Sequence, residues 1–240
     1  FDLRKPTPEL LKYYNDLSKG SILTVAIAPE DDKDHATIKY AVANGIKVCL
    51  GFTSCSFEEA QQAIAEGASN VVHVFNCMAQ MSSRDPHLPL AALINDAVYS
   101  EVVVDGGHVN PGIINLVGRM KGKDKLISVT DGGPLKGHAP GIYKMKYGDV
   151  RLTEAGYCVR VDNGKLAGNV LPFIKNIRNM QILGDLPEVT AINAVTCNPA
   201  RFLGIDHYKG YIKENYQADL TVYDSEYNVL QTYVKGEEMI

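Results

Sequence analysis

The stretch NVVHVFNCM, residues 70–78, joins a short apolar run to a cluster of polar side chains. An apolar run of this length is typical of a strand that is buried on both faces of a sheet. We therefore expect a strand over 70–75, with His73 near its carboxyl end and Asn76 directly after it. Parallel sheets carry their chemistry at that end of their strands, so the stretch predicts a sheet and a site together.

The same pattern recurs over residues 6–133, where apolar runs of strand length alternate with helical spacing. The expected strands cover 21–29, 46–51, 70–75, 101–106 and 125–133. The expected helices cover 6–19, 34–45, 56–67, 89–97 and 111–122. This alternation predicts an α/β protein whose βα units build a parallel sheet with neighbours in chain order. Five such strands are too few to close an eight-stranded barrel, and a five-stranded open sheet is the simpler alternative.

The alternation stops after residue 136. Residues 137–168 are strand-like with tight turns at EAG and DNG, which predicts a β-hairpin insertion. Helical spacing returns over 169–210, and period-two alternation over 211–240 predicts a pair of antiparallel strands on a separate small sheet. The expected organisation is therefore βα units over 1–136, followed by these three segments.

The composition excludes several classes of protein. The chain has 240 residues and a formal net charge of −4, without a basic run, so we expect no binding to nucleic acid. It contains no apolar stretch of about 18 residues, so we expect no membrane association. The five cysteines show no CxxC spacing and are typical of reduced thiols in a cytoplasmic protein.

Polar residues and glycines stand at the carboxyl ends of all five expected strands. An aspartate there is placed to act as a general base toward water, although it often caps the next helix instead. A single histidine there is most often a structural residue, but the companion motifs favour a ligand or substrate contact. Glycines leave room for a substrate close to the backbone. The five ends read APE (28–30), GFT (51–53), HVFN (73–76), DGGH (105–108) and TDGG (130–133).

Taken in order, these motifs resemble those of the N-acetylglucosamine-6-phosphate deacetylases of the amidohydrolase superfamily. The resemblance rests on HVFNCM followed by RDP, on VVDGGHV, SVTDGG, KLAGNVL, NPARFLG and ADLTVYD, and it spans essentially the whole chain. It implies an α/β fold that is a partial (β/α)8 TIM-like barrel, strands four to eight, with a small β-sandwich appendage. The segments 1–136 and 169–210 would form the barrel. The earlier strands, with the family's metal-binding glutamate and a substrate-binding histidine, would lie outside the chain.

The resemblance also implies the roles of individual residues. Asp131 would be the catalytic acid/base, His73 a ligand of a divalent metal of the zinc or iron class, and Arg84 the phosphate-binding residue. The cradle for the sugar would consist of Asn76, Cys77, His108, Leu166, Ala167 and Gly168. The implied enzyme is a metal-dependent homodimeric hydrolase that removes acetate from N-acetylglucosamine 6-phosphate, giving glucosamine 6-phosphate in amino-sugar catabolism. A metal would activate the water, Asp131 would move its proton to the departing amine, and arginine suits bidentate phosphate recognition.

One position departs from the family pattern. Phe52 stands in Gly51-Phe52-Thr53, where the family has a metal-binding histidine, and a phenyl ring has no lone pair to donate. Cys55 lies nearby, but its offset from the strand end is wrong for a direct replacement. We therefore expect the metal to be weakly bound or absent. A non-catalytic or impaired relative that binds amino-sugar phosphate is the alternative to an active enzyme.

Overall fold

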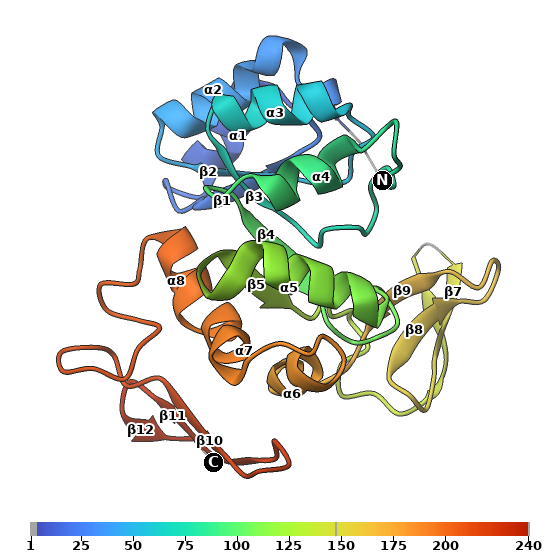
Figure 1. Cartoon of the computed structure of the whole chain (residues 1–240), viewed down its shortest axis with the longest axis vertical. Coiled ribbons are helices and arrows are strands. Elements are labelled where there is room, and N and C mark those ends of the chain that lie inside the picture. The colour runs from blue at the N-terminus through green and yellow to red at the C-terminus, as the bar shows by residue number, and fades with distance from the viewer. Residues whose placement is uncertain (1–3, 147, 240) are drawn as a thin grey trace.

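A parallel sheet of five strands lies at the centre of the computed structural model, which describes residues 4–146 and 148–239 (Figure 1). The expected segments 1–136, 137–168 and 211–240 therefore each include a residue outside the described ranges. Neighbouring strands follow chain order, and each pair is parallel. This confirms the strand order expected from the sequence. The strands are β1 (Thr24–Ile27), β2 (Lys47–Leu50), β3 (Ala68–Val71), β4 (Tyr99–Val103) and β5 (Leu126–Val129).

The third strand is shorter than its apolar pattern indicates. The strand expected over 70–75 is wrong at its end, because β3 stops at Val71 and the next residues form turns. His73 adopts a φ of +30°, which takes the backbone out of the extended region. The ladder nevertheless continues, since the Val72 amide donates to Leu50 O at 3.0 Å and the Val74 amide to Glu101 O at 2.8 Å. His73 thus lies in a turn that is still fastened to both neighbouring strands.

Helices follow the strands and cover the sheet, as Figure 1 shows. The start of α3 is fixed by a capping box, in which Ser56 Oγ accepts from the Glu59 amide at 3.1 Å and the Glu59 carboxylate accepts from the Ser56 amide at 2.8 Å. The helices are α1 (Pro8–Leu17), α2 (Ala36–Ala43), α3 (Phe57–Ala65), α4 (His87–Ile94), α5 (Pro111–Lys125), α6 (Lys175–Ile182), α7 (Glu188–Val195) and α8 (Cys197–Leu203). Two short 3-10 helices, Pro29–Asp31 and Lys33–His35, follow β1.

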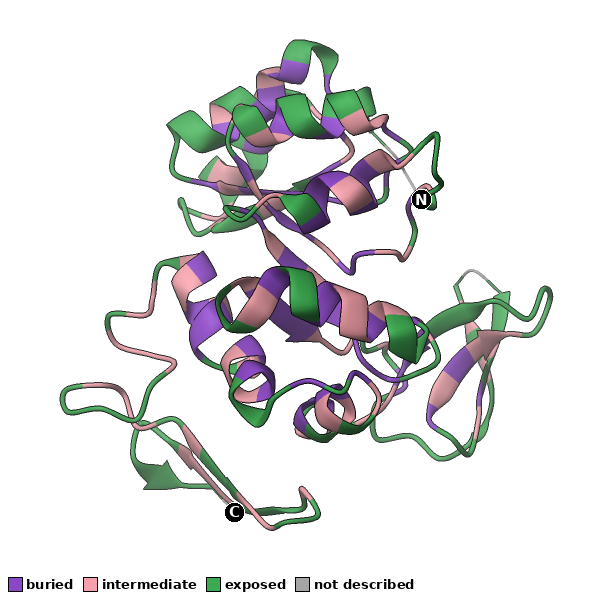
Figure 2. Ribbon diagram, in the orientation of Figure 1, coloured by how far each residue is buried: buried purple, intermediate pink, exposed green. Residues whose placement is uncertain are grey.

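The core lies between the helices and the sheet. Figure 2 shows buried residues along the strands and on the inward faces of the helices. Full burial of one such aliphatic side chain contributes roughly 1.5–3 kcal/mol, so this interface supplies most of the stability of the sheet. Fully buried examples are Ile38, Leu50, Leu88, Ile114 and Leu126.

Two antiparallel sheets lie on different sides of the molecule (Figure 1). The segment expected to be a hairpin holds four strands, β6 (Gly141–Met145), β7 (Gly148–Leu152), β8 (Tyr157–Arg160) and β9 (Leu166–Asn169). The C-terminal segment holds three, β10 (Leu220–Tyr223), β11 (Val229–Val234) and β12 (Glu237–Glu238). Of the expected β-sandwich, the described residues 211–239 therefore form one sheet, because β12 adds to the expected pair of strands instead of packing on it as a second layer.

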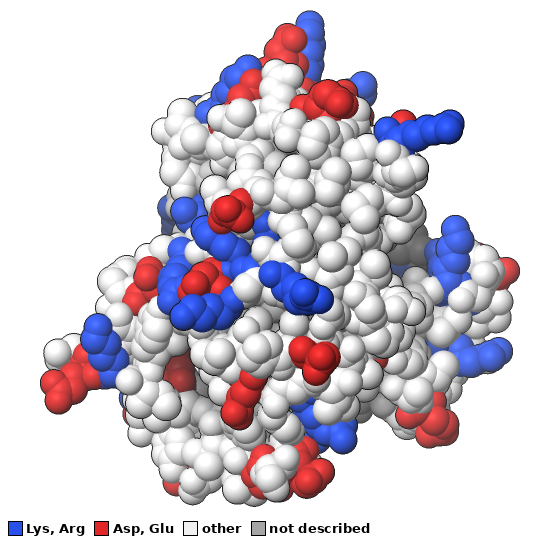
Figure 3. Space-filling model, viewed as in Figure 1, with Lys and Arg blue, Asp and Glu red and all other residues white. Residues whose placement is uncertain are grey.

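The surface and the helices give two further observations. On the face drawn in Figure 3, basic and acidic side chains are interspersed over a largely uncharged surface.

Within residues 4–146 and 148–239, every helix is too short or too polar to cross a membrane.

Candidate active site

Polar side chains from β4 and β5 meet at the carboxyl edge of the parallel sheet. Asp105 and His108 follow β4, and Asp131 follows β5. His108 Nδ1 lies 2.6 Å from Asp105 Oδ2, and His108 Nε2 lies 4.0 Å from Asp131 Oδ2. The order Asp105–His108–Asp131 therefore places an imidazole between two carboxylates. The structure brings together two of the predicted site residues, Asp131 and His108, from segments that the sequence separates.

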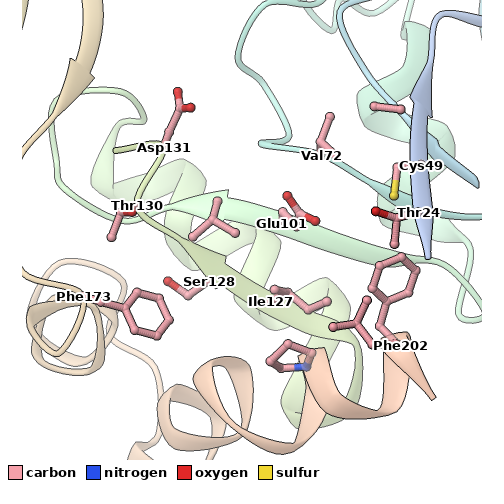
Figure 4. A pocket seen from close by; sticks show the side chains of 14 residues that line it. Thr24, Cys49, Val72, Glu101, Ile127, Ser128, Thr130, Asp131, Phe173 and Phe202 are labelled. Carbon is pink, nitrogen blue, oxygen red and sulfur yellow. The ribbon is translucent and has the colours of Figure 1, made fainter. Parts of the chain in front are cut away.

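The two carboxylates differ in exposure. The Asp105 side chain is 3% exposed, whereas the Asp131 side chain is 48% exposed. The backbone of Asp131 adopts a φ of +48° just after β5. Asp131 lies at one end of a cavity of about 460 Å³, and Phe202 lies at the other (Figure 4). The inward-facing side chains of Cys49, Val72 and Glu101 line the cavity between them. Asp131 is thus the carboxylate that a substrate can reach.

Electrostatics favour the charged forms of the buried pair. The hydrogen bond to Asp105 raises the pKa of His108, against the effect of burial, and the charge of Asp131 acts in the same direction. Burial opposes ionisation of Asp105, but hydrogen bonds from the His108 side chain and from the His108 and Gly107 amides outweigh it and lower the pKa of Asp105. The pair is therefore an ion pair over the pH range between its two pKa values.

The predicted substrate-binding segment 166–168 lies in β9, next to Asp131. Gly168 adopts a φ of +103°, and a Cβ atom there would lie 3.0 Å from Asp131 O. Only glycine combines that backbone conformation with so close an approach. Leu166 and Ala167 are exposed next to it. The segment thus forms a wall beside Asp131.

The predicted metal ligand His73 lies in the turn after β3. His73 is 8% exposed, and its Nδ1 lies 3.1 Å from the backbone oxygen of Asn76. The ring of Phe52 packs edge-on against it, with 4.5 Å between the ring centroids and 87° between the ring planes. Asn76 Nδ2 is buried and has no hydrogen-bond partner within the described residues, although it is a donor. Cys77, next in the chain, is exposed.

Glu30 is a candidate site residue that the sequence analysis missed. It follows β1 in the 3-10 helix, and its Oε1 accepts from the Ser54 amide at 2.6 Å while its Oε2 accepts from Thr53 Oγ1. The carboxylate therefore lies beside the loop that carries Phe52. The signal was present in the sequence, since APE ends a strand as the other site motifs do. The family resemblance instead implied that the metal-binding glutamate lies outside the chain.

Arg84 lies in the exposed loop between β3 and α4. Ser82 Oγ accepts from its backbone amide at 3.3 Å. Within the part of the chain that the structure describes, its guanidinium pairs with neither Asp85 nor Asp96, so a structural ion pair does not hold it. Arg84 is exposed in this loop, where a ligand in solution can reach its guanidinium.

The donor atoms of this chain do not suffice for a divalent metal. Across residues 4–146 and 148–239, no group of three or more His, Cys, Asp or Glu side chains lies close enough to hold one. The phenyl ring of Phe52 packs against the imidazole of His73 and has no lone pair to donate to a metal. Cys55 offers no replacement, because burial raises its pKa to about 11 and keeps it a thiol. Weak or absent metal binding in this chain therefore remains a prediction, which metal titration can test.

Comparison with known proteins gives one family. The model of the "Amidohydrolase family" matches residues 30–239. The N-acetylglucosamine-6-phosphate deacetylase of Lysinibacillus sphaericus is 31% identical over 232 residues, which are 97% of this chain and 59% of that protein. The N-acetylgalactosamine-6-phosphate deacetylase of Escherichia coli is 28% identical over 92% of this chain and 58% of that protein. The chain thus spans about three-fifths of the length of the curated relatives it matches.

A solved structure supports the same relationship. The N-acetyl-D-glucosamine-6-phosphate deacetylase of Mycobacterium smegmatis superposes with a TM-score of 0.92 at 27% identity. The match covers 99% of this chain and 63% of that one. The α/β fold with its parallel sheet is therefore shared with this solved structure.

Proposed function

The chain belongs to the amidohydrolase family, and from this premise we propose that it hydrolyses the acetamide of N-acetylglucosamine 6-phosphate, releasing acetate and glucosamine 6-phosphate. The observation that carries the proposal is the His108–Asp131 pair, 4.0 Å apart at the carboxyl edge of the sheet. Deacetylases of N-acetylated hexosamine 6-phosphates, at about 30% identity over nearly the whole chain, support the choice of substrate.

The two side chains suit the two halves of an amide hydrolysis. An oxygen atom can lie about 2.8 Å from both His108 Nε2 and Asp131 Oδ2, since these atoms are 4.0 Å apart. Asp131 accepts the proton of an attacking water and delivers it to the departing amine nitrogen as the C–N bond breaks. In its charged form, which the hydrogen bond to Asp105 favours, His108 donates a hydrogen bond to the acetamide oxygen as negative charge develops there. No step of this scheme uses a metal, because the donors present do not fit one.

The remaining predicted residues would hold the sugar phosphate. Asn76 Nδ2 is a buried donor that needs an acceptor, and a sugar hydroxyl or the acetamide oxygen would supply it. The segment 166–168 would contact the ring, with Cys77 at the open side. Arg84 would bind the phosphate through paired hydrogen bonds, either in its own subunit or across a homodimer interface.

The sheet itself supports a proposal about architecture. We infer that β1 to β5 occupy the places of strands four to eight of a (β/α)8 barrel. In the described chain, β1 pairs only with β2 and β5 only with β4, so both edges offer unpaired backbone groups. The cavity lined by Cys49, Val72 and Glu101 would be the interior of that barrel.

Release of acetate tests the function. The purified chain is incubated with N-acetylglucosamine 6-phosphate and, separately, with its galactosamine epimer, and acetate and free amine are measured. We expect equal amounts of both products and a preference for the glucosamine substrate. Calorimetry with the same ligand separates the two alternatives. Binding without acetate would replace the hydrolase proposal with the sugar-phosphate-binding relative that Phe52 favours.

A further inference from the structure

The carboxylate of Asp105 accepts four hydrogen bonds in a nearly closed environment. Its Oδ1 accepts from the amides of Gly107 and His108, both at 2.9 Å. Its Oδ2 accepts from His108 Nδ1 at 2.6 Å and from Asn169 Nδ2 at 2.9 Å. The residue is only 7% exposed. A carboxylate with this many donors is ionised and has one orientation.

This orientation determines which nitrogen of His108 faces the substrate. Because Nδ1 points at Asp105, it carries a proton whether the ring is neutral or charged. Nε2 is left to face Asp131. The His108 side chain is itself 7% exposed, so its ring has little freedom to turn.

Two side chains of the β6–β9 sheet complete the arrangement. Asn169, at the end of β9, donates to Asp105 and also to Thr130 O at 2.6 Å, next to Asp131. Tyr157, in β8, donates from its hydroxyl to Asp105 O at 2.7 Å, and its ring leaves no room for a Cβ atom at Gly107. The antiparallel sheet therefore fastens the ends of β4 and β5 to each other.

We propose that Asp105 is a positioning residue, which with Asn169 and Tyr157 fixes the tautomer and orientation of His108 toward Asp131. Its effect on catalysis rests on the proposed function, whereas its effect on the imidazole does not. We name Asp105, His108, Asn169 and Tyr157 the Asp105 network. A purely structural role, in which Asp105 only closes the turn 105–108, is the competing explanation. That role would leave the tautomer and the pKa of His108 unchanged when the carboxylate is lost.

NMR of the histidine side chains tests the proposal directly. In the unmodified chain, long-range proton–nitrogen spectra at high pH should show neutral His108 with its proton on Nδ1. A proton on Nε2 would overturn the proposal, and this measurement needs no variant. The His108 resonances are assigned with His108→Gln, since the chain has six histidines.

Titration of the Asp105→Asn variant gives the second test. Among the described residues, the charged groups that act on His108 are Asp105 and Asp131, and only the first changes. We expect the pKa of His108 to fall toward or below its ordinary value near 6.5, because the charged acceptor is lost. Tyr157→Phe is the milder variant and should lower the pKa of His108 less. Asp162→Asn, which changes an exposed carboxylate in the turn between β8 and β9, should leave the pKa of His108 unchanged. An unchanged pKa in Asp105→Asn would refute the role.

Activity separates this proposal from the proposed function. If the unmodified chain releases acetate, Asp105→Asn should lower kcat about 10–100-fold and move the alkaline limb of the kcat/KM profile to lower pH. A drop in kcat with an unmoved profile would mean that Asp105 is only structural. If the unmodified chain releases no acetate, the proposed function fails, and the tautomer of His108 still decides the positioning role.

Discussion

The two halves of the carboxyl edge differ in how complete they are without a ligand. At the ends of β4 and β5, the Asp105 carboxylate accepts four hydrogen bonds and orients His108. At the His73 end, which we define as Phe52, His73 and Asn76, a phenyl ring meets the imidazole and a buried amide has no partner. A preorganised half can stabilise charge at once, whereas the other half needs something added before it can act. The predictions below alter one half at a time.

The largest effect is expected from Asp131→Asn, which removes the proton acceptor beside His108. Turnover should fall by at least about 10²-fold, because an amide side chain cannot shuttle the proton. Stability should persist, since asparagine tolerates the φ of +48° that Asp131 adopts. Acetate release and urea unfolding measure the two effects, with Asp162→Asn as the control. If the variant simply unfolds, Asp131 is a capping residue and the catalytic role is wrong.

Phe52→His would complete the His73 end with a second imidazole. We expect zinc affinity to rise by more than about tenfold, since even residues that only orient a ligand change affinity by that much. The two rings are similar in size, so folding should not change. Calorimetric titration with Zn²⁺ measures the affinity, and Phe173→His, which lines the cavity of about 460 Å³, is the matched control. Equal affinities of the two variants would show that Phe52 does not stand at a metal position.

Arg84→Ala tests the phosphate contact, which belongs to neither half. Hydrogen bonds to a charged group contribute roughly 1.5–3 kcal/mol, so the affinity for N-acetylglucosamine 6-phosphate should fall about 10–100-fold. The affinity for unphosphorylated N-acetylglucosamine should stay nearly constant. Calorimetry with both ligands makes the comparison, and Arg119→Ala, on α5, provides a control of equal charge. Equal losses for both ligands would remove Arg84 from the phosphate site.

The comparison also shows what a sequence can predict here. The order of β1 to β5 follows from alternating apolar runs, because buried parallel strands need apolar residues on both faces. The end of β3 does not follow, since a left-handed backbone at His73 leaves no trace in an apolar pattern. Motifs predicted Asp131 and His108 at the ends of expected strands, and Gly168 within the KLAGNVL segment.

The contacts of Asp105 with Asn169 and Tyr157 cannot be predicted from local sequence patterns. Asn169 and Asp105 are 64 positions apart, and Tyr157 and Asp105 are 52 apart. Nothing in a short window relates them, because the antiparallel sheet that joins them has its own strand pairing. For Glu30 the local pattern was sufficient, because APE is visible at the end of an expected strand. Its carboxylate was nevertheless not predicted as a site residue.

The smallest expected effect is a pH dependence of stability that belongs to the Asp105 half alone. The pKa of His108 is raised by its hydrogen bond to Asp105, so its contribution is fully present below the unfolded value near 6.5 and is lost as pH rises through the folded pKa. The pKa of Asp105 is lowered, because hydrogen bonds outweigh its burial. Its contribution is present above about 3.9 and is lost as pH falls through the folded pKa.

Stability from this pair should therefore be greatest between about pH 4 and 6.5, at roughly 1.4 kcal/mol for each unit of pKa difference. The midpoint of urea unfolding, measured from pH 3 to 9, gives the profile. In His108→Gln, the decrease of stability above about pH 6.5 should disappear, because glutamine has no charge to lose as the pH rises. His207→Gln replaces a histidine outside the network and should keep the profile of the unmodified chain. If both variants behave alike, the ion pair does not govern stability, and the contrast between the two halves lies in geometry and not in charge.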